Sequence, residues 1–129
     1  MKYEIPIAPI GKPRMVKSDS WRKRPCVTRY WQFKDDLNHL CNHAGYKQGN
    51  ELYAVFRIPM PKSWSLSKKK LMLEQMHDQK FDVDNIIKAV LDCLLPSGDE
   101  KVHTFCVKKI WSDKPGIVFF DSFYDWVGA

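Results

Sequence analysis

One stretch near the middle of the chain, FDVDNIIKAVLDCLLPSGDEKV at residues 81–102, limits the possible folds more than any other. Its apolar residues recur at helical spacing: Ile87, Val90, Leu91 and Leu94. This spacing predicts an amphipathic helix that begins at Asn85, has Asp84 as its N-cap, and ends at Pro96 and Gly98. Such a helix buries its apolar face against another layer of secondary structure, so the chain is expected to form a layered domain.

The remaining elements follow from local patterns. Strands are predicted over residues 1–8, 52–58, 101–111 and 116–124, and the last two are expected to form a hairpin with its turn at 112–115. Helices are predicted over residues 29–44, capped by Thr28, and over 66–76, capped by Ser65 or Ser67. The order predicts an α+β fold: a single domain over residues 1–129, with a mixed β-sheet and helices packed mainly on one face.

The positive charge of the chain is concentrated in one segment. The net charge is +6, and residues 11–30 alone carry seven basic residues against one acid, Asp19, so the remainder is balanced. The candidate nucleic-acid contacts in this segment are Lys12, Arg14, Arg22, Lys23, Arg24 and Arg29. Trp21 and Tyr30 are interleaved with them, which suits phosphate contacts and base stacking. The alternative is a solvated loop whose charge serves only solubility.

Other features exclude whole classes of protein. No apolar run approaches the ~18 residues of a transmembrane helix. The N-terminus has no apolar core of signal-peptide length, and the four cysteines form no CxxC pair. We therefore expect a cytosolic protein, with reduced cysteines and no membrane partner.

Carboxylates gather around the predicted central helix. In an extended segment 81–84, Asp82 and Asp84 would point the same way, and the turn at residues 96–98 would bring Asp99 back toward them. Three converging carboxylates suit Mg²⁺, with Mn²⁺ as the alternative ion. Lys88, one turn after Asp84, would neutralise the acids, pair with Asp92 or hold a phosphate. The alternative is structural: Asp84 only a cap, Asp82 a surface acid, and Asp99-Glu100 a turn.

Two neighbouring features have less specific interpretations. His77 precedes the acids by five residues, and a surface histidine is favoured there over a general base. Residues 68–70 are three consecutive lysines, for which a solvated helix face is favoured over a DNA contact.

The motif DVDNIIKAVLDCL followed by GDEKV resembles the signature of the RusA-type crossover-junction endodeoxyribonucleases. The stretches GKPRM, WRKRPCVTRYWQFKDDL and MPKSWSLSKKK look similar to the N-terminal part of phage-type members, so the resemblance covers nearly the whole chain. It implies a small α+β homodimer that resolves four-way (Holliday) junctions by paired, Mg²⁺-dependent nicks, in recombination and repair. A phage or prophage origin is implied as well.

By the same resemblance, the catalytic and metal-binding aspartates fall on Asp82, Asp84 and Asp99, and the essential lysine falls on Lys88. Many members have Asp-Asp in the last acidic turn, so either Asp99 or Glu100 is the third ligand, and Asp99 is favoured. Two other functions remain open. The first is a nucleic-acid-binding module without catalysis, and the second is a metal-dependent nuclease that prefers flaps, replication forks or RNA.

Overall fold

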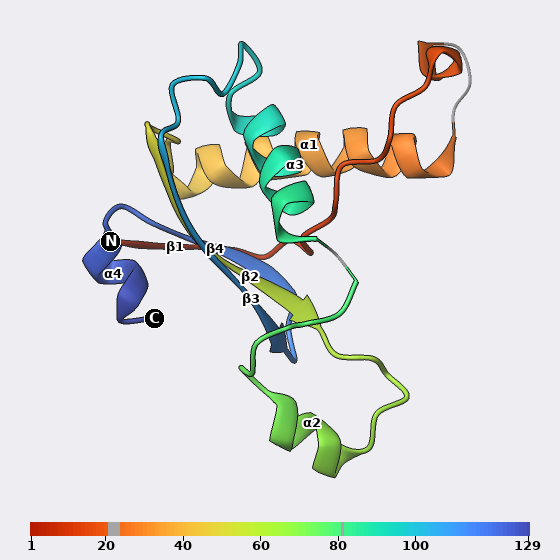
Figure 1. The fold of residues 1–129 in the computed structure, drawn as a ribbon, viewed down its shortest axis with the longest axis vertical. Coiled ribbons are helices and arrows are strands. Elements are labelled where there is room, and N and C mark those ends of the chain that lie inside the picture. The colour runs from red at the N-terminus through yellow and green to blue at the C-terminus, as the bar shows by residue number, and fades with distance from the viewer. Residues whose placement is uncertain (21–23, 81) are drawn as a thin grey trace.

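The computed structural model describes residues 1–20, 24–80 and 82–129. Figure 1 shows a sheet with two long helices across one face and a short helix standing away from the body. The elements in chain order are β1 (Lys2–Ile5), the 3₁₀-helix η1 (Lys17–Ser20), α1 (Pro25–Ala44), β2 (Glu51–Pro59), α2 (Leu66–Met72), α3 (Val83–Leu94), β3 (Thr104–Ser112), β4 (Gly116–Phe120) and α4 (Phe123–Val127).

The strands of the described residues form one mixed sheet in the order β1-β4-β2-β3. β4 is antiparallel to both β1 and β2, whereas β2 and β3 are parallel. The predicted hairpin of the last two strands is therefore wrong, because β2 lies between them. The reason is burial: every residue of β4 is buried, while most of β3 is only partly buried, so β4 takes an inner position and β3 an edge.

The core confirms the expected α+β class. α1 and α3 cover one face of the sheet and bury Phe33, Leu37, Ile86 and Val90 in one core cluster with Phe119 of β4. The short helix α4 covers part of the other face, where Trp126 packs on a small second cluster and donates a hydrogen bond to the Ala54 carbonyl (2.9 Å). In the described ranges, none of the helices has the length and apolar composition needed to cross a bilayer.

Several predicted element ends are wrong: β1 stops at Ile5 instead of residue 8, β3 begins at Thr104 instead of residue 101, and three further ends have a clear physical reason. α1 begins at Pro25 with Arg24 as N-cap, not after Thr28, because proline is well suited to the first helical position. α3 begins at Val83, so Asp82 and not Asp84 is its N-cap residue. The predicted strand 116–124 stops at Phe120, because Ser122 caps α4 by accepting a hydrogen bond from the Asp125 amide (3.2 Å).

Residues 60–80 leave the sheet at the end of β2 and return along the outer edge of β3; we call them the flap. Ser65 caps α2 within the flap, as expected, but the helix ends at Met72 instead of residue 76. The returning chain then hydrogen-bonds to β3, from Glu74 to the Trp111 carbonyl (2.8 Å) and from His77 to the Lys109 carbonyl (2.9 Å). Sheet-edge hydrogen bonds therefore replace the last helical turn, and His77 is buried, not on the surface.

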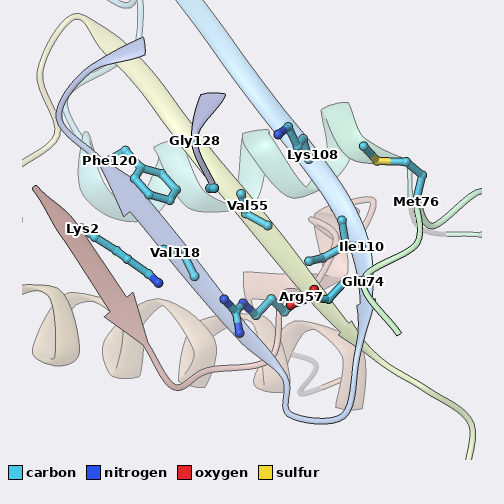
Figure 2. A pocket seen from close by; sticks show the side chains of 11 residues that line it. Lys2, Val55, Arg57, Glu74, Met76, Lys108, Ile110, Val118, Phe120 and Gly128 are labelled. Carbon is cyan, nitrogen blue, oxygen red and sulfur yellow. The ribbon is translucent and has the colours of Figure 1, made fainter. Parts of the chain in front are cut away.

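The face of the sheet opposite α1 and α3 holds a hollow of about 390 Å³. Figure 2 shows its apolar floor, made by Val55, Ile110 and Val118, with the charged side chains of Lys2 and Arg57 on its rim. This hollow is distinct from the one that contains the predicted acids.

Candidate active site at the N-terminal end of α3

The predicted acids lie at the start of α3. Asp82 is extended (φ −63°, ψ 129°) and its carbonyl accepts the first helical hydrogen bonds, from Asn85 and Ile86. Its side chain makes no capping hydrogen bond, and Asp84 lies in the first helical turn. The predicted extended geometry thus holds for Asp82 but not for Asp84. Both side chains are exposed, and neither makes an ion pair with another described residue.

An open cleft with a volume of about 710 Å³ lies over this helix end. Its lining comes from α3 and from the loop that follows β1: Lys12, Pro13, Arg14, Met15, Asp82, Asp84, Asn85 and Lys88. The structure therefore brings together two of the predicted acids, the predicted lysine and two members of the basic segment. Because the helix N-terminus carries partial positive charge, it favours carboxylates and phosphate oxygens here.

The loop is held to the helix by a reciprocal pair of hydrogen bonds. The Lys12 amide donates to the Asn85 carbonyl (3.3 Å), and the Asn85 side-chain amide donates to the Lys12 carbonyl (3.2 Å). The approach is so close that a Cβ at Gly11 would lie 2.7 Å from Asn85 Nδ2. Asn85 therefore fixes the basic loop beside the acids. The sequence patterns did not predict a role for Asn85 in the site, although its position directly after Asp84 could have indicated one.

Asp92 provides the second anchor of the loop. Its Oδ2 lies 2.6 Å from Lys12 Nζ and accepts a hydrogen bond from the Tyr30 hydroxyl (2.8 Å). Burial alone would raise the pKa of Asp92, but the hydrogen bonds from Lys12 and Tyr30 outweigh it and lower the pKa. Asp92 thus pairs with Lys12. The alternative from the sequence, a pair between Asp92 and Lys88, is wrong. Lys88 is left exposed in the cleft, without an ion pair to any described residue.

The third predicted acid lies elsewhere. Asp99 follows the C-terminal end of α3, and the twelve helical residues between it and Asp82 span roughly 18 Å. Figure 1 shows the loop after α3 at the far end of that helix from the start of α3. The expectation that the turn at 96–98 returns Asp99 to the other acids is therefore wrong for this structure, since the chain leaves α3 toward β3.

The basic segment divides into engaged and free side chains. Arg24 binds Asp19 through two hydrogen bonds of 2.8 Å and also donates to the Arg14 carbonyl. The Arg24 guanidinium and the Val16 amide lower the pKa of Asp19 to about 2. Arg14, beside the cleft, and Arg29, on α1, are exposed. Arg22 and Lys23 lie outside the described residues.

The cleft fits a divalent ion only in part. Carboxylate oxygens suit Mg²⁺ and Mn²⁺, and Mg²⁺ is typically held by one or two carboxylates together with waters and substrate phosphates. Asp82 and Asp84 supply two such carboxylates. Within residues 1–20, 24–80 and 82–129, no group of three His, Cys, Asp or Glu side chains is arranged to hold a metal ion. Two protein ligands plus a phosphate is thus the set that this cleft offers.

An α+β domain with two unpaired carboxylates and a lysine in an open cleft, flanked by a basic loop, has the parts of a metal-dependent nuclease. The family model described as Endodeoxyribonuclease RusA matches residues 6–119, which include the whole cleft. The chain belongs to the RusA endodeoxyribonuclease family. It is therefore a metal-dependent crossover-junction endonuclease that resolves Holliday junctions in recombination and repair, and its substrate is branched DNA. No curated protein and no solved structure matches the chain.

Proposed function

We propose that Asp82 and Asp84 bind Mg²⁺ together with the phosphate to be cut, and that Lys88 stabilises the charge that develops on this phosphate. One observation carries the proposal: two carboxylates and a lysine that form no ion pair with another described residue line a single cleft. The metal would polarise the phosphate and lower the pKa of a bound water. Mn²⁺ is the natural substitute ion.

The remaining steps belong to the chain itself. Arg14, exposed at the rim of the same cleft, would hold a neighbouring phosphate of the backbone. Lys12 would act more weakly on DNA, because Asp92 already neutralises it. Arg24 is likewise held by Asp19, so its first role is to shape the basic loop. Arg29, with Arg22 and Lys23, would contact the arms of the junction.

We retain Asp99, implied by the resemblance, as the third proposed ligand, with Glu100 as the alternative. In the described conformation its carboxylate is a helix length from Asp82. It would reach a metal either by a movement of residues 95–103 or from a second copy of the chain. Mixing inactive Asp84→Asn and Asp99→Asn proteins separates these routes, because cleavage is regained only if two copies share a site. Loss of cleavage in Glu100→Gln, with Asp99→Asn fully active, would assign the ligand to Glu100.

We further propose that the protein acts as a homodimer, because two symmetric strands of a junction require two symmetric sites. The bacterial cytosol is the proposed place of action, on phage or prophage DNA. All four cysteines are free in the structure, which suits a reducing compartment.

The test is cleavage of a labelled synthetic four-way junction, with linear duplex, flap and fork substrates beside it. We expect paired nicks in Mg²⁺, none in EDTA, and none with Asp84→Asn. An Asp113→Asn variant, altered at an exposed acid outside the cleft, is the matched control and should cut normally. Cleavage by Asp84→Asn at the native rate would remove the proposed metal ligand, and a preference for flaps or forks would reassign the substrate.

A further inference from the structure

We propose that the flap, residues 60–80, is a second DNA-binding surface that holds the backbone of the duplex leading into the cleft. The inference rests on the proposed function, since it assumes that the cleft is where DNA is cut. The flap lies outside the basic segment at residues 11–30, and it carries none of the residues assigned to the site.

Charge is the first argument. The flap has five lysines, at positions 62, 68, 69, 70 and 80, against two acids, Glu74 and Asp78. Its local excess of three positive charges is cancelled in the total by acids elsewhere, which is why the sequence outside residues 11–30 looks neutral. Lys62, Lys68, Lys70 and Lys80 are exposed, so their charges are available to phosphates.

Packing is the second argument. α2 has no buried residue, and Leu66 and Leu71 are 78% and 74% exposed. A helix of seven residues is not stable through its own hydrogen bonds, and of its apolar side chains only Met72 packs, half-buried, against the core, so α2 contributes little to folding. Figure 1 shows α2 standing away from the sheet and from the two long helices. Binding therefore explains an exposed, charged helix of this kind better than a contribution to stability does.

The third argument is that the flap is held in a fixed position at its base. Trp64 packs on Trp111 (ring centroids 4.8 Å apart), and Trp111 packs on the buried His77 (4.2 Å). The ammonium group of Lys68 lies 4.3 Å from the centre of the Trp64 ring, so the first lysine of the run is positioned by the same column. Both ends of the flap also hydrogen-bond to β3. The lysines therefore stand on a rigid support.

Position is the fourth argument. Asp82 in the cleft is only five positions after His77, at the base of the flap, a span of at most roughly 17 Å. Lys109 fixes part of this connection by donating to the Gln79 carbonyl (3.1 Å). In Figure 1 the flap and η1 extend away from the start of α3 in different directions. DNA bound in the cleft would thus meet Arg14 of the basic loop in the cleft itself and the lysines of the flap on another side.

A protein partner is the other class of ligand for an exposed element with leucines. Leu66 and Leu71 are five residues apart, which places them roughly 140° apart around the helix axis, so they form no shared apolar face. The excess of lysines favours a polyanion, and DNA is the polyanion that this family acts on.

The experiment compares two triple variants of the full chain. The flap variant is Lys68→Gln with Lys69→Gln and Lys70→Gln. The control removes three exposed lysines elsewhere, Lys47→Gln with Lys101→Gln and Lys114→Gln, and has the same net charge. The Kd for a labelled four-way junction is measured by fluorescence anisotropy in EDTA over a range of salt concentrations, and circular dichroism checks that both variants are folded.

We expect the flap variant to bind about tenfold more weakly at low salt than the control, with a salt dependence shallower by about two to three in log–log slope. Equal Kd values and equal slopes in the two variants would overturn the inference. Cleavage in Mg²⁺ by the unaltered chain is measured separately. If the unaltered chain does not cleave the junction, the proposed function is wrong, whereas the binding comparison still tests whether the flap binds DNA.

Discussion

Two of the hollows in the described part of this molecule differ in what lines them. The hollow on the bare face of the sheet has an apolar floor, and its cations are engaged: Lys2 pairs with Glu4 (3.2 Å), Arg57 approaches the same carboxylate (4.0 Å), and Lys108 lies over Trp126 (4.5 Å). The cleft at the start of α3 is more open and holds acids and a lysine without partners among the described residues.

This difference distinguishes a hollow that results from packing, on the bare sheet face, from a cleft suited to chemistry, at the start of α3. Paired charges and an apolar floor result wherever a half-covered sheet meets solvent. Unpaired charges of both signs in one cleft leave favourable interactions unmade, and a metal ion and a phosphate would make them. We therefore propose the open cleft, with its charges free of described partners, as the functional site, although the other hollow is more enclosed.

The strongest test of this contrast is Asp82→Asn. Removal of one of two carboxylate ligands should reduce metal-dependent junction cleavage by at least about a hundredfold, as loss of a major electrostatic contribution does. Junction binding in EDTA should be unchanged or tighter, since a negative charge near DNA is lost. Metal affinity, followed by isothermal titration with Mn²⁺, should fall together with the rate. Cleavage at the native rate would show that the unpaired acids are not ligands.

Lys88→Met should have the next largest effect. It keeps the length of the side chain and removes the charge, so single-turnover cleavage should slow by about a hundredfold while Mn²⁺ affinity is retained or rises. The matched control is Lys47→Met, altered at an exposed lysine outside the cleft. A parallel loss of metal affinity and rate would assign Lys88 to site assembly instead of charge stabilisation.

Gly11→Ala tests whether the cleft depends on the placement of its loop. The new Cβ would lie 2.7 Å from Asn85 Nδ2 and would disturb the two hydrogen bonds between Lys12 and Asn85. We expect cleavage to fall by about tenfold because the basic loop shifts relative to the acids. Gly49→Ala is the control, since a Cβ there has nothing within 4 Å. Equal rates for both variants would remove the loop from catalysis.

The Arg24–Asp19 pair should affect stability more than activity. The pKa of Asp19 is lowered from 3.8 to about 2 in the folded state, so the pair contributes stability above pH 4. That contribution disappears as the pH falls through the window from about 4 to about 2. Asp19→Asn should therefore lower the Tm at pH 7 and differ less from the unaltered chain at pH 2. A constant difference in Tm across this range would contradict the assignment.

The smallest effect is expected on the bare sheet face. A Lys2→Gln, Lys108→Gln double variant should change the Kd for the junction by less than about twofold, because these cations already have intramolecular partners. The two variants can be compared because both remove surface lysines that lie outside the cleft. A larger change than in the flap variant would move the DNA-binding surface to this face.

The sequence predicted much of the local structure. Period-2 and period-3.6 patterns identified the main strands, the α1 stripe of Tyr30, Phe33 and Leu37, and the apolar face of α3. It also placed Asp82, Asp84 and Lys88 in one site, because these residues are close along one helix end. It missed α4, whose cap at Ser122 lies within a stretch that is also rich in strand-forming aromatics.

What only the tertiary structure decided are the relations between distant segments. Strand propensity could not show that β4 inserts between β1 and β2, because this order depends on how completely each strand can be buried. Nor could spacing show that Asp92 binds Lys12, 80 positions away, instead of Lys88, or that α3 holds Asp99 apart from Asp82. Patterns along a chain encode which face each element buries. The packing of those faces, which depends on the volume and burial of the whole core, decides which elements and charges meet.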